Sequence, residues 1–408
     1  MITRSRRSVG AALLAAGTAA GLASCGSAHA VQATPSAAPV RLSLATSADY
    51  PDGSWAVLVM GGSAAQHNNF WQVFVRPGLA GAWKLATPPG AASNGGITVA
   101  PEGGPALAAA IRPSQDLSFS PLVSSSDNGA KWAQAGLLDA PLAGYPDALA
   151  AAPDGGLIAL TRTGDVELRA RPGADWTRLA SARTVAGAAG RGCLPAQLTS
   201  VAYSPSGAPL VAGGCTRGGR AGIFRLAGGH WTRTGPALPA ALARRDVEVL
   251  QMARAGRTVA ALLAVGGGPA TRLIGAWSNQ DGTSWTLSQP FQAGPARPLS
   301  AAFGSSTSGT GSSGSPASAG GGSLGVVLSG GRAVSVSGPG AAWRSLPALP
   351  ARAWSAPDGG VTLAAAPRGF EALTARGGQL SVWALSSGGS AWSRSQVINV
   401  AIPYGSSG

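Results

Sequence analysis

Short apolar runs separated by tight-turn residues extend along most of the chain after residue 40. In the stretch 198–234, for example, apolar segments lie at 198–203, 209–213, 222–226 and 231–234, and Gly, Pro and Ser bound them. Apolar runs bounded in this way are typical of β-strands joined by hairpins. We therefore expect four short strands in this stretch, with the first turn at 204–207.

The same arrangement recurs with a period of about 51 residues. Its first marker is a turn of the type Pro-x-Gly, in which Pro presets φ and Gly accepts positive φ. Copies occur at 50–53, 100–103, 152–155, 204–207 and 356–359, with a degenerate copy at 254–256. The copy expected near 306 is replaced by a Gly/Ser-rich insert, 304–323, which we interpret as an expansion of this turn. A tryptophan runs in phase with the turns: Trp83, Trp132, Trp176, Trp231, Trp285, Trp343 and Trp392.

Seven such periods fill residues 41–402. Four-stranded units of this length, repeated seven times, predict an all-β fold, a seven-bladed β-propeller of four-stranded antiparallel blades. The tryptophan of each period is expected to fill the space between neighbouring blades. The Pro-x-Gly turns would occupy one face of the ring, and the second-to-third and fourth-to-first connections the opposite face, where binding loops are usual.

The N-terminus has the pattern of an export signal. Three arginines within the first seven residues precede an apolar stretch, 9–22, that is too short to span roughly 30 Å of hydrocarbon. The sequence Leu22-Ala23-Ser24-Cys25 resembles the bacterial lipobox, and this resemblance implies cleavage before Cys25 and acylation of its thiol. We interpret 1–24 as a lipoprotein signal peptide, 25–40 as the lipidated cysteine and a flexible tether, and 403–408 as a tail.

This interpretation places the mature protein outside the cytoplasm, on the outer face of the cell membrane, with its lipid as the anchor. An ordinary secretory signal cleaved after Ala30 is the alternative. Ser5-Arg6-Arg7 leaves twin-arginine export open beside the general secretory route.

The charge balance is basic, with 30 Lys and Arg against 16 Asp and Glu. Loss of the three signal arginines lowers the formal charge from +14 to +11. This excess reflects either compositional drift in a GC-rich genome or attraction to acidic surfaces such as anionic lipid or wall polymer. The extracytoplasmic location excludes nucleic acid as a partner, and a monomer is expected.

With Cys25 acylated, Cys193 and Cys215 remain as a pair. Because exported proteins reside in an oxidising setting, we expect a disulfide between them. The bridge would close a loop of about 23 residues and stabilise the fold by roughly 3 kcal/mol.

Two segments resemble the Asp-box, S-x-D-x-G-x-x-W, of sialidases and other BNR-repeat propellers. The first has Ser125, Asp127, Gly129 and Trp132 in register. The second has Ser278, Gly282 and Trp285, with Gln280 where the aspartate belongs. The resemblance implies structural hairpins between third and fourth strands, away from any active site.

The sialidase family needs three arginines that clamp a carboxylate, a tyrosine nucleophile with its glutamate, and an aspartate acid/base. A catalytic interpretation would use Arg112, Tyr145, Asp147 and Glu248. The five other tryptophan repeats retain little of the Asp-box, and no zinc, calcium or Ser-His-Asp spacing is present. We therefore expect no metal and no cofactor. A divergent sialidase-like exo-glycosidase is the alternative to a non-catalytic binding module, with a redox propeller as a third class.

The expected binding face carries polar and basic loop residues, and it would receive an acidic glycan, a wall polymer or an envelope protein. The candidates are His67, Asn69, Arg112, Arg217, Arg220, Arg272 and Arg368. The alternative is a scatter of unrelated, solvated arginines.

Overall fold

The computed structural model describes residues 46–50, 53–61, 69–78, 81–91, 96–112, 117–188, 197–216, 219–255, 258–279, 281–304, 322–350, 360–366, 369–386 and 389–401, with only the backbone of 46–50 and 69. These residues all belong to one compact unit, Ala37–Gly408. The predicted signal peptide, Cys25 and the tether to residue 40 lie outside the described residues. None of the described helices has the length and apolar character needed to cross a membrane.

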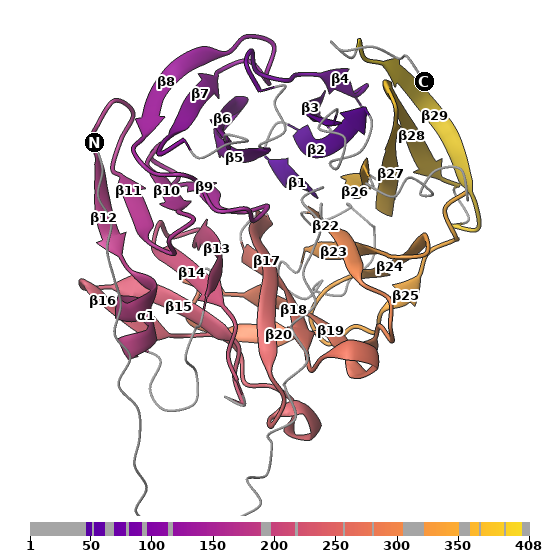
Figure 1. Ribbon diagram of the computed structural model, residues 1–408. Coiled ribbons are helices and arrows are strands. Elements are labelled where there is room, and N and C mark those ends of the chain that lie inside the picture. The colour runs from indigo at the N-terminus through magenta and orange to yellow at the C-terminus, as the bar shows by residue number, and fades with distance from the viewer. Residues whose placement is uncertain are drawn as a thin grey trace, which may run out of the picture. The chain divides into compact units, whose positions relative to one another are not determined.

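The strands form seven four-stranded antiparallel blades around a common centre, which confirms the predicted seven-bladed β-propeller (Figure 1). The first four blades are β1 (Thr46–Tyr50), β2 (Gly53–Gly61), β3 (Asn69–Pro77) and β4 (Lys84–Leu85); β5 (Ile97–Gly103), β6 (Ala106–Ile111), β7 (Ser120–Ser125) and β8 (Ala133–Leu138); β9 (Leu149–Ala151), β10 (Leu157–Leu160), β11 (Val166–Arg169) and β12 (Trp176–Ala180); and β13 (Leu198–Tyr203), β14 (Pro209–Gly213), β15 (Gly222–Ala227) and β16 (His230–Arg233).

The remaining three blades are β17 (Val247–Ala255), β18 (Thr258–Val265), β19 (Arg272–Ser278) and β20 (Trp285–Leu287); β22 (Pro298–Gly304), β23 (Ser323–Leu328), β24 (Arg332–Val336) and β25 (Arg344–Ser345); and β26 (Gly360–Ala366), β27 (Gly369–Arg376), β28 (Gln379–Leu385) and β29 (Trp392–Asn399). Beside them lie β21 (Phe291–Gln292), which pairs with β19, the helix α1 (Ala182–Ala188), and the 3-10 turns η2 (Ala240–Leu242) and η3 (Gly268–Ala270).

The fourth blade matches its sequence prediction almost residue by residue, because its turns are chemically unambiguous. Ser204 closes the first turn: its hydroxyl accepts the N–H of Ala208 at 2.9 Å, and Gly207 takes a φ of 85°. The Gly/Ser-rich insert follows β22 and precedes β23, so it does replace a first-to-second turn. Residues 305–321 of the insert lie outside the described residues.

The seventh blade departs from the prediction. β26 begins at Gly360 and is the first strand of its sheet, so the motif at 356–359 precedes the blade instead of joining its first two strands. Residues 367–368 make that connection. The predicted turn was wrong because Pro-Asp-Gly occurs in many kinds of loop, and only strand pairing shows which loop it closes.

The second strands of the blades are continuous apolar runs, because neighbouring sheets cover both of their faces. Leu157 to Leu160 in β10 and Leu210 to Ala212 in β14 are fully buried. The outermost strands alternate instead, as in β29, where exposed and half-buried positions follow one another. Apolar packing between sheets is therefore concentrated on the inner strands.

Three of the tryptophans at or before the fourth strands bond to the preceding blade, in keeping with the prediction that they lie between neighbouring blades. The Trp132 indole N–H donates to the Ala86 carbonyl at 2.8 Å, and that of Trp392 donates to the Pro347 carbonyl at 2.8 Å. Trp343 bonds in the same way to the hydroxyl of Ser288 at 3.1 Å. A buried indole N–H needs an acceptor, so each bond sets how the two sheets meet.

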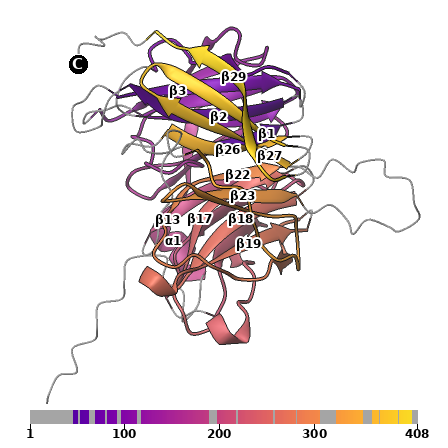
Figure 2. The same ribbon diagram turned by 90° about the vertical axis from the view of Figure 1, so that its right-hand side faces the viewer.

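The first blade lies beside the seventh (Figure 2), and no described strand is shared between them. One backbone bridge, between Gly61 and Gly377, and several side chains join the two blades. Glu371 in β27 accepts from the Arg76 guanidinium at 2.6 Å and from the Trp83 indole at 3.0 Å. Arg76 is only 1 % exposed, and its other terminal nitrogen donates to Ser54 and to the Ala365 carbonyl. The Gln396 amide pairs with both backbone polar groups of Trp83. This set of contacts closes the ring.

We expect Glu371→Gln to lower the free energy of unfolding by about 3 kcal/mol, because the buried Arg76 charge loses its counter-ion. Denaturant unfolding at pH 7 measures this change. The matched control is Glu167→Gln, whose partner Arg178 has a side chain that is 66 % exposed. The control should change the free energy by less than about 1 kcal/mol. Equal effects of the two substitutions would contradict the closing role of Glu371.

Candidate functional site: the arginine face and the central pocket

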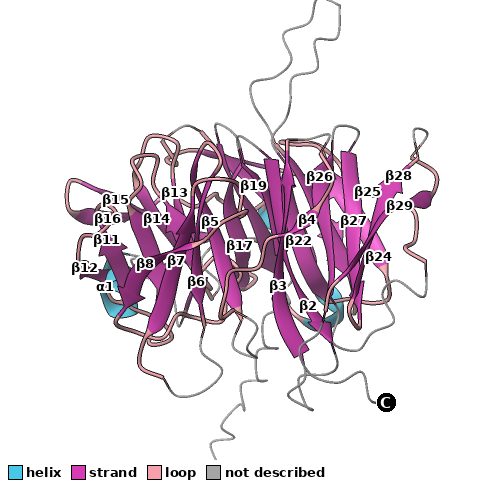
Figure 3. Ribbon diagram, turned by 90° about the horizontal axis from the view of Figure 1, so that it is seen from above, coloured by secondary structure: helices cyan, strands magenta, loops and turns pink. Residues whose placement is uncertain are grey.

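The strands run between two faces of connecting loops (Figure 3). One face carries the first-to-second and third-to-fourth turns. The other carries the second-to-third and fourth-to-first connections, including α1 between the third and fourth blades and η2 between the fourth and fifth. We call the second one the connection face.

Four arginines gather on the connection face at the fourth blade. Arg233, at the end of β16, donates through its guanidinium to the Arg220 carbonyl. The Gly219 carbonyl accepts the N–H of Leu238, which brings this loop against the segment that leads through η2 to the exposed Arg244 and Arg245. Burial, and next the charge of Arg220, lower the pKa of Arg233. Arg220 and Arg233 therefore lie together, and the segment that carries Arg244 and Arg245 packs beside the Arg220 loop.

A second basic group flanks β21 on the same face. Arg272 pairs through its backbone with Gln292, and the Arg332 guanidinium stacks over the Phe291 ring at 5.3 Å from its centroid. We define the arginine face as Arg220, Arg233, Arg244, Arg245, Arg272 and Arg332. No salt bridge among the described residues joins any of these six to a carboxylate.

The prediction for Arg112 as an exposed binding residue was wrong. Its side chain is 3 % exposed, stacks on the Trp71 ring at 5.9 Å and donates to the Ile97 carbonyl at 3.3 Å. Burial lowers the pKa of Arg112 to about 10. Residues from neighbouring blades enclose this side chain, which the sequence of its own loop does not reveal.

The other predicted binding residues are only partly described. Arg220 and Arg272 lie on the connection face as predicted. His67, Arg217 and Arg368 lie outside the described residues, as does the side chain of Asn69. Arg233, Arg244 and Arg245 were missed, although the Arg244-Arg245 pair between two strand patterns was a usable signal.

The structure tests the predicted disulfide only at Cys215. Cys215 is disulfide-bonded and buried, and its backbone pairs with Val247 at the start of β17. Cys193 lies outside the described residues, so the Cys193–Cys215 pairing stays a prediction.

The two segments compared with Asp-boxes are hairpins between third and fourth strands, at the predicted places. In the first, the Ser125 hydroxyl accepts the Gly129 N–H, and Asp127 accepts the Lys131 N–H, each at 2.9 Å. In the second, the Asn279 side chain accepts the N–H groups of Thr283 and Ser284. Asn279 thus supplies the side-chain acceptor of this hairpin, whereas Gln280, where the Asp-box has its aspartate, lies outside the described residues. Gly129 and Gly282 both take positive φ, which these turns require.

The four residues of the proposed catalytic set do not form one cluster. Tyr145 and Asp147 lie in the connection between β8 and β9 as predicted, and the Arg112 guanidinium lies against Gly144, next to Tyr145. Asp147 bonds instead to the Ser200 hydroxyl and to the Met252 N–H, at 2.7 Å for the latter. Glu248 is buried on β17. Arg112 and Tyr145 are therefore neighbours, while Asp147 faces a separate cavity.

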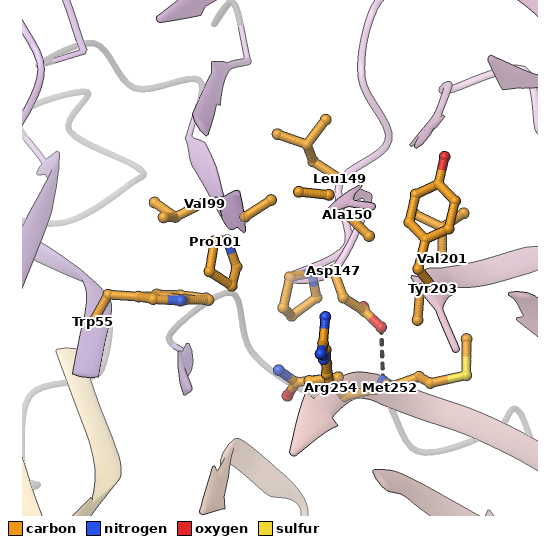
Figure 4. Close-up of a pocket in the computed structure, with 16 residues that line it drawn as sticks. Trp55, Val99, Pro101, Asp147, Leu149, Ala150, Val201, Tyr203, Met252 and Arg254 are labelled. Carbon is orange, nitrogen blue, oxygen red and sulfur yellow. Dashed lines mark hydrogen bonds between the residues drawn. The ribbon is translucent and has the colours of Figure 1, made fainter. Parts of the chain in front are cut away.

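That cavity is a partly open pocket among the first strands of blades two to five, with Trp55 of β2 on one side (Figure 4). On the remaining side of the ring, β1 pairs in parallel with β22. Pro101, Tyr203 and Arg254 stand at or near the ends of their strands, so the pocket lies toward the first-to-second turns. Its walls are mainly Ala, Val, Leu and Pro side chains.

Asp147 is the one carboxyl group in the lining of this pocket, and it is 8 % exposed. Both of its donors bond to Oδ2, and Oδ1 has no hydrogen-bond partner. Burial raises the pKa of Asp147 well above its ordinary value, against the opposing effect of the Met252 N–H. The site therefore favours the neutral acid. Within the described part of the chain, no group of three His, Cys, Asp or Glu residues is arranged to hold a metal.

No protein-family model matches the sequence, and no curated protein matches it significantly. Solved propeller structures do resemble the fold. A protein from Lactobacillus plantarum is 11% identical with a TM-score of 0.50 over 85% of this chain and 96% of its own. The periplasmic gluconolactonase of Pseudomonas aeruginosa is 14% identical with a TM-score of 0.49 over 86% and 97%. YCF48 bound to D1 peptide is 15% identical with a TM-score of 0.39 over 76% and 81%. These likenesses show the fold alone.

We expect Asp147→Asn to raise the free energy of unfolding at pH 7, with a gain that disappears as the pH falls toward 4. The unfolded chain ionises Asp147 near its ordinary pKa of about 3.9, whereas the folded chain holds it neutral. The contribution of Asp147 to the free energy of unfolding is therefore complete below the unfolded pKa and is lost as the pH rises above it. The asparagine oxygen can still accept from Ser200 and Met252. Denaturant unfolding between pH 4 and pH 8 measures the change.

Asp127→Asn is the control of opposite sign. The Lys131 N–H and the Ser125 hydroxyl lower the pKa of Asp127, so its stabilisation is present above the unfolded pKa and is lost on acidification. The two substitutions should show opposite pH trends. Parallel trends would contradict the assignment of a neutral Asp147.

Proposed function

We propose that this protein is a lipid-anchored, extracytoplasmic binding module whose arginine face captures an acidic polymer, a glycan or a wall polymer. The observation that carries the proposal is the like charge of Arg220 beside Arg233, with the exposed Arg244 and Arg245 on the segment that packs against the Arg220 loop. Adjacent guanidinium groups repel one another unless an anion neutralises them. A polymer with repeated carboxylates or phosphates would do so across several groups at once.

The breadth of the arginine face supports a polymer over a small anion. Arg272 and Arg332 extend it from the fourth blade across the fifth and sixth. Arg332 and Phe291 add a flat cation–π surface against which a sugar ring can pack. The formal charge of +11 after loss of the three signal arginines also attracts acidic partners toward the protein. The hairpins that resemble Asp-boxes are consistent with a propeller used for glycan recognition. Membership of the BNR-repeat family is part of this proposal.

We expect the triple substitution Arg220→Ala, Arg244→Ala and Arg245→Ala to weaken binding to hyaluronan or polyglycerol phosphate by at least about tenfold at low salt. The control is Arg171→Ala, Arg344→Ala and Arg394→Ala, which removes the same charge from exposed positions elsewhere. Biolayer interferometry at 50 and 500 mM salt measures both. The difference between the triples should shrink at high salt because screening weakens surface electrostatics.

Equal loss in the two triples would show that only net charge matters and would overturn the assignment of the arginine face. If neither polymer binds and the wild-type chain instead retains an envelope protein through the same arginines, the ligand is a protein. That result would replace the polymer proposal.

The anchor is tested separately. We expect Cys25→Ala to abolish incorporation of labelled palmitate and to move the protein from the membrane fraction to the soluble fraction, because the acyl chains supply the membrane affinity. Ala30→Leu should leave processing unchanged. Accumulation of precursor in the Ala30 variant, with normal processing of the Cys25 variant, would instead indicate an ordinary secretory signal.

A further inference from the structure

The central pocket contains two buried polar atoms that have no hydrogen-bond partner. One is Oδ1 of Asp147 and the other is the indole nitrogen of Trp55, whose side chain is 5 % exposed. Both residues line the same cavity, with Trp55 on one side and Asp147 farther across (Figure 4). A buried polar group without a partner carries a free-energy penalty, so two of them on one cavity point to a missing ligand.

The hydrogen bonds of Asp147 decide what the pocket offers. Oδ2 already accepts from Ser200 and Met252, so a proton on this carboxyl group resides on Oδ1. No salt bridge among the described residues compensates a charge on Asp147. An isolated buried carboxylate is strongly unfavourable, and burial favours the protonated acid. The pocket then presents two donors, the Asp147 O–H and the Trp55 N–H.

The surroundings argue against a charged occupant. Arg254 lines the pocket, and the protein carries a net charge of +14, so a cation meets an unfavourable potential. Arg254 already has another interaction, and the walls are otherwise mainly apolar, so an anion would lose more hydration than the lining replaces. Val99, Leu149, Val201 and Met252 instead match an apolar body.

We propose that the central pocket binds an uncharged, largely apolar molecule whose carbonyl or ether oxygens accept hydrogen bonds from Asp147 and Trp55. This site is separate from the arginine face. It is lined by the first strands and lies toward the opposite set of turns. The proposal for the central pocket is therefore independent of whether the arginine face binds a polymer.

The test compares four probes of similar size: 2,6-diacetylnaphthalene, naphthalene, 2-naphthylmethylammonium and 2-naphthoate. The full chain carries Cys25→Ser, so that no acyl chain competes for the probes. Equilibrium dialysis measures the dissociation constants. The diketone should bind about three- to tenfold more tightly than naphthalene through its hydrogen bonds, and both charged probes should bind more weakly than naphthalene.

Substitutions then identify the donors. Trp55→Phe removes the N–H and should weaken diketone binding about three- to tenfold without affecting naphthalene. Trp277→Phe is the matched control, because Trp277 is also buried with an unpaired indole nitrogen but does not line the pocket. Asp147→Asn should preserve diketone binding within about threefold, because its amide N–H can replace the acid proton while its oxygen accepts from Ser200 and Met252.

Ala150→Phe should abolish binding of both neutral probes by filling the cavity, with folding verified by circular dichroism. Tighter binding of the ammonium probe that is lost in Asp147→Asn would overturn the proposal in favour of a cation site. Preference for the carboxylate would also overturn it. So would binding unaffected by Ala150→Phe, or the absence of binding of the diketone at millimolar concentration.

Discussion

The meeting of the first and seventh blades is the constraint on which the rest of this structure depends. The inner strands of each blade are covered on both faces, so an open ring would leave apolar surface of two blades in water. Each blade comes from one contiguous stretch of chain, and among the described strands none is shared by the first and seventh blades. Glu371 performs the joining role by accepting from Arg76 and Trp83 together. Trp83 thus bonds to the neighbouring blade as several other blade tryptophans do, and this bond helps to close the ring.

The closed ring also places the two candidate sites. First strands converge on the centre, and on one side β1 pairs with β22 through the backbone. The central pocket consequently lies against blades one to five, where Asp147 meets Ser200 and Met252. The arginine face occupies loops that the blade packing leaves exposed, so its residues are free to carry charge. The two sites have opposite character because one is enclosed by sheets and the other faces solvent.

Much of the fold could be predicted because its signals are local and repeated. Pro-x-Gly turns and in-phase tryptophans identified the blades, and the four strands from β13 to β16 were placed nearly to the residue. The same local reasoning failed at the seventh blade. There the motif at 356–359 looks like the others but precedes β26. A turn motif specifies a change of chain direction and does not specify which strands pair across it.

The sequence by itself determined the seven-bladed architecture, the strands of the fourth blade and the presence of many arginines. It did not distinguish the arginines from one another. Arg112 and Arg220 were predicted to share one exposed face, yet Trp71 and Gly96 from other segments enclose Arg112. The environment of Asp147 is likewise made by Ser200 and Met252, which lie 53 and 105 residues farther along the chain. Only the tertiary structure decides burial, because burial depends on neighbours that are distant in sequence, and burial sets both the charge and the chemistry of these groups.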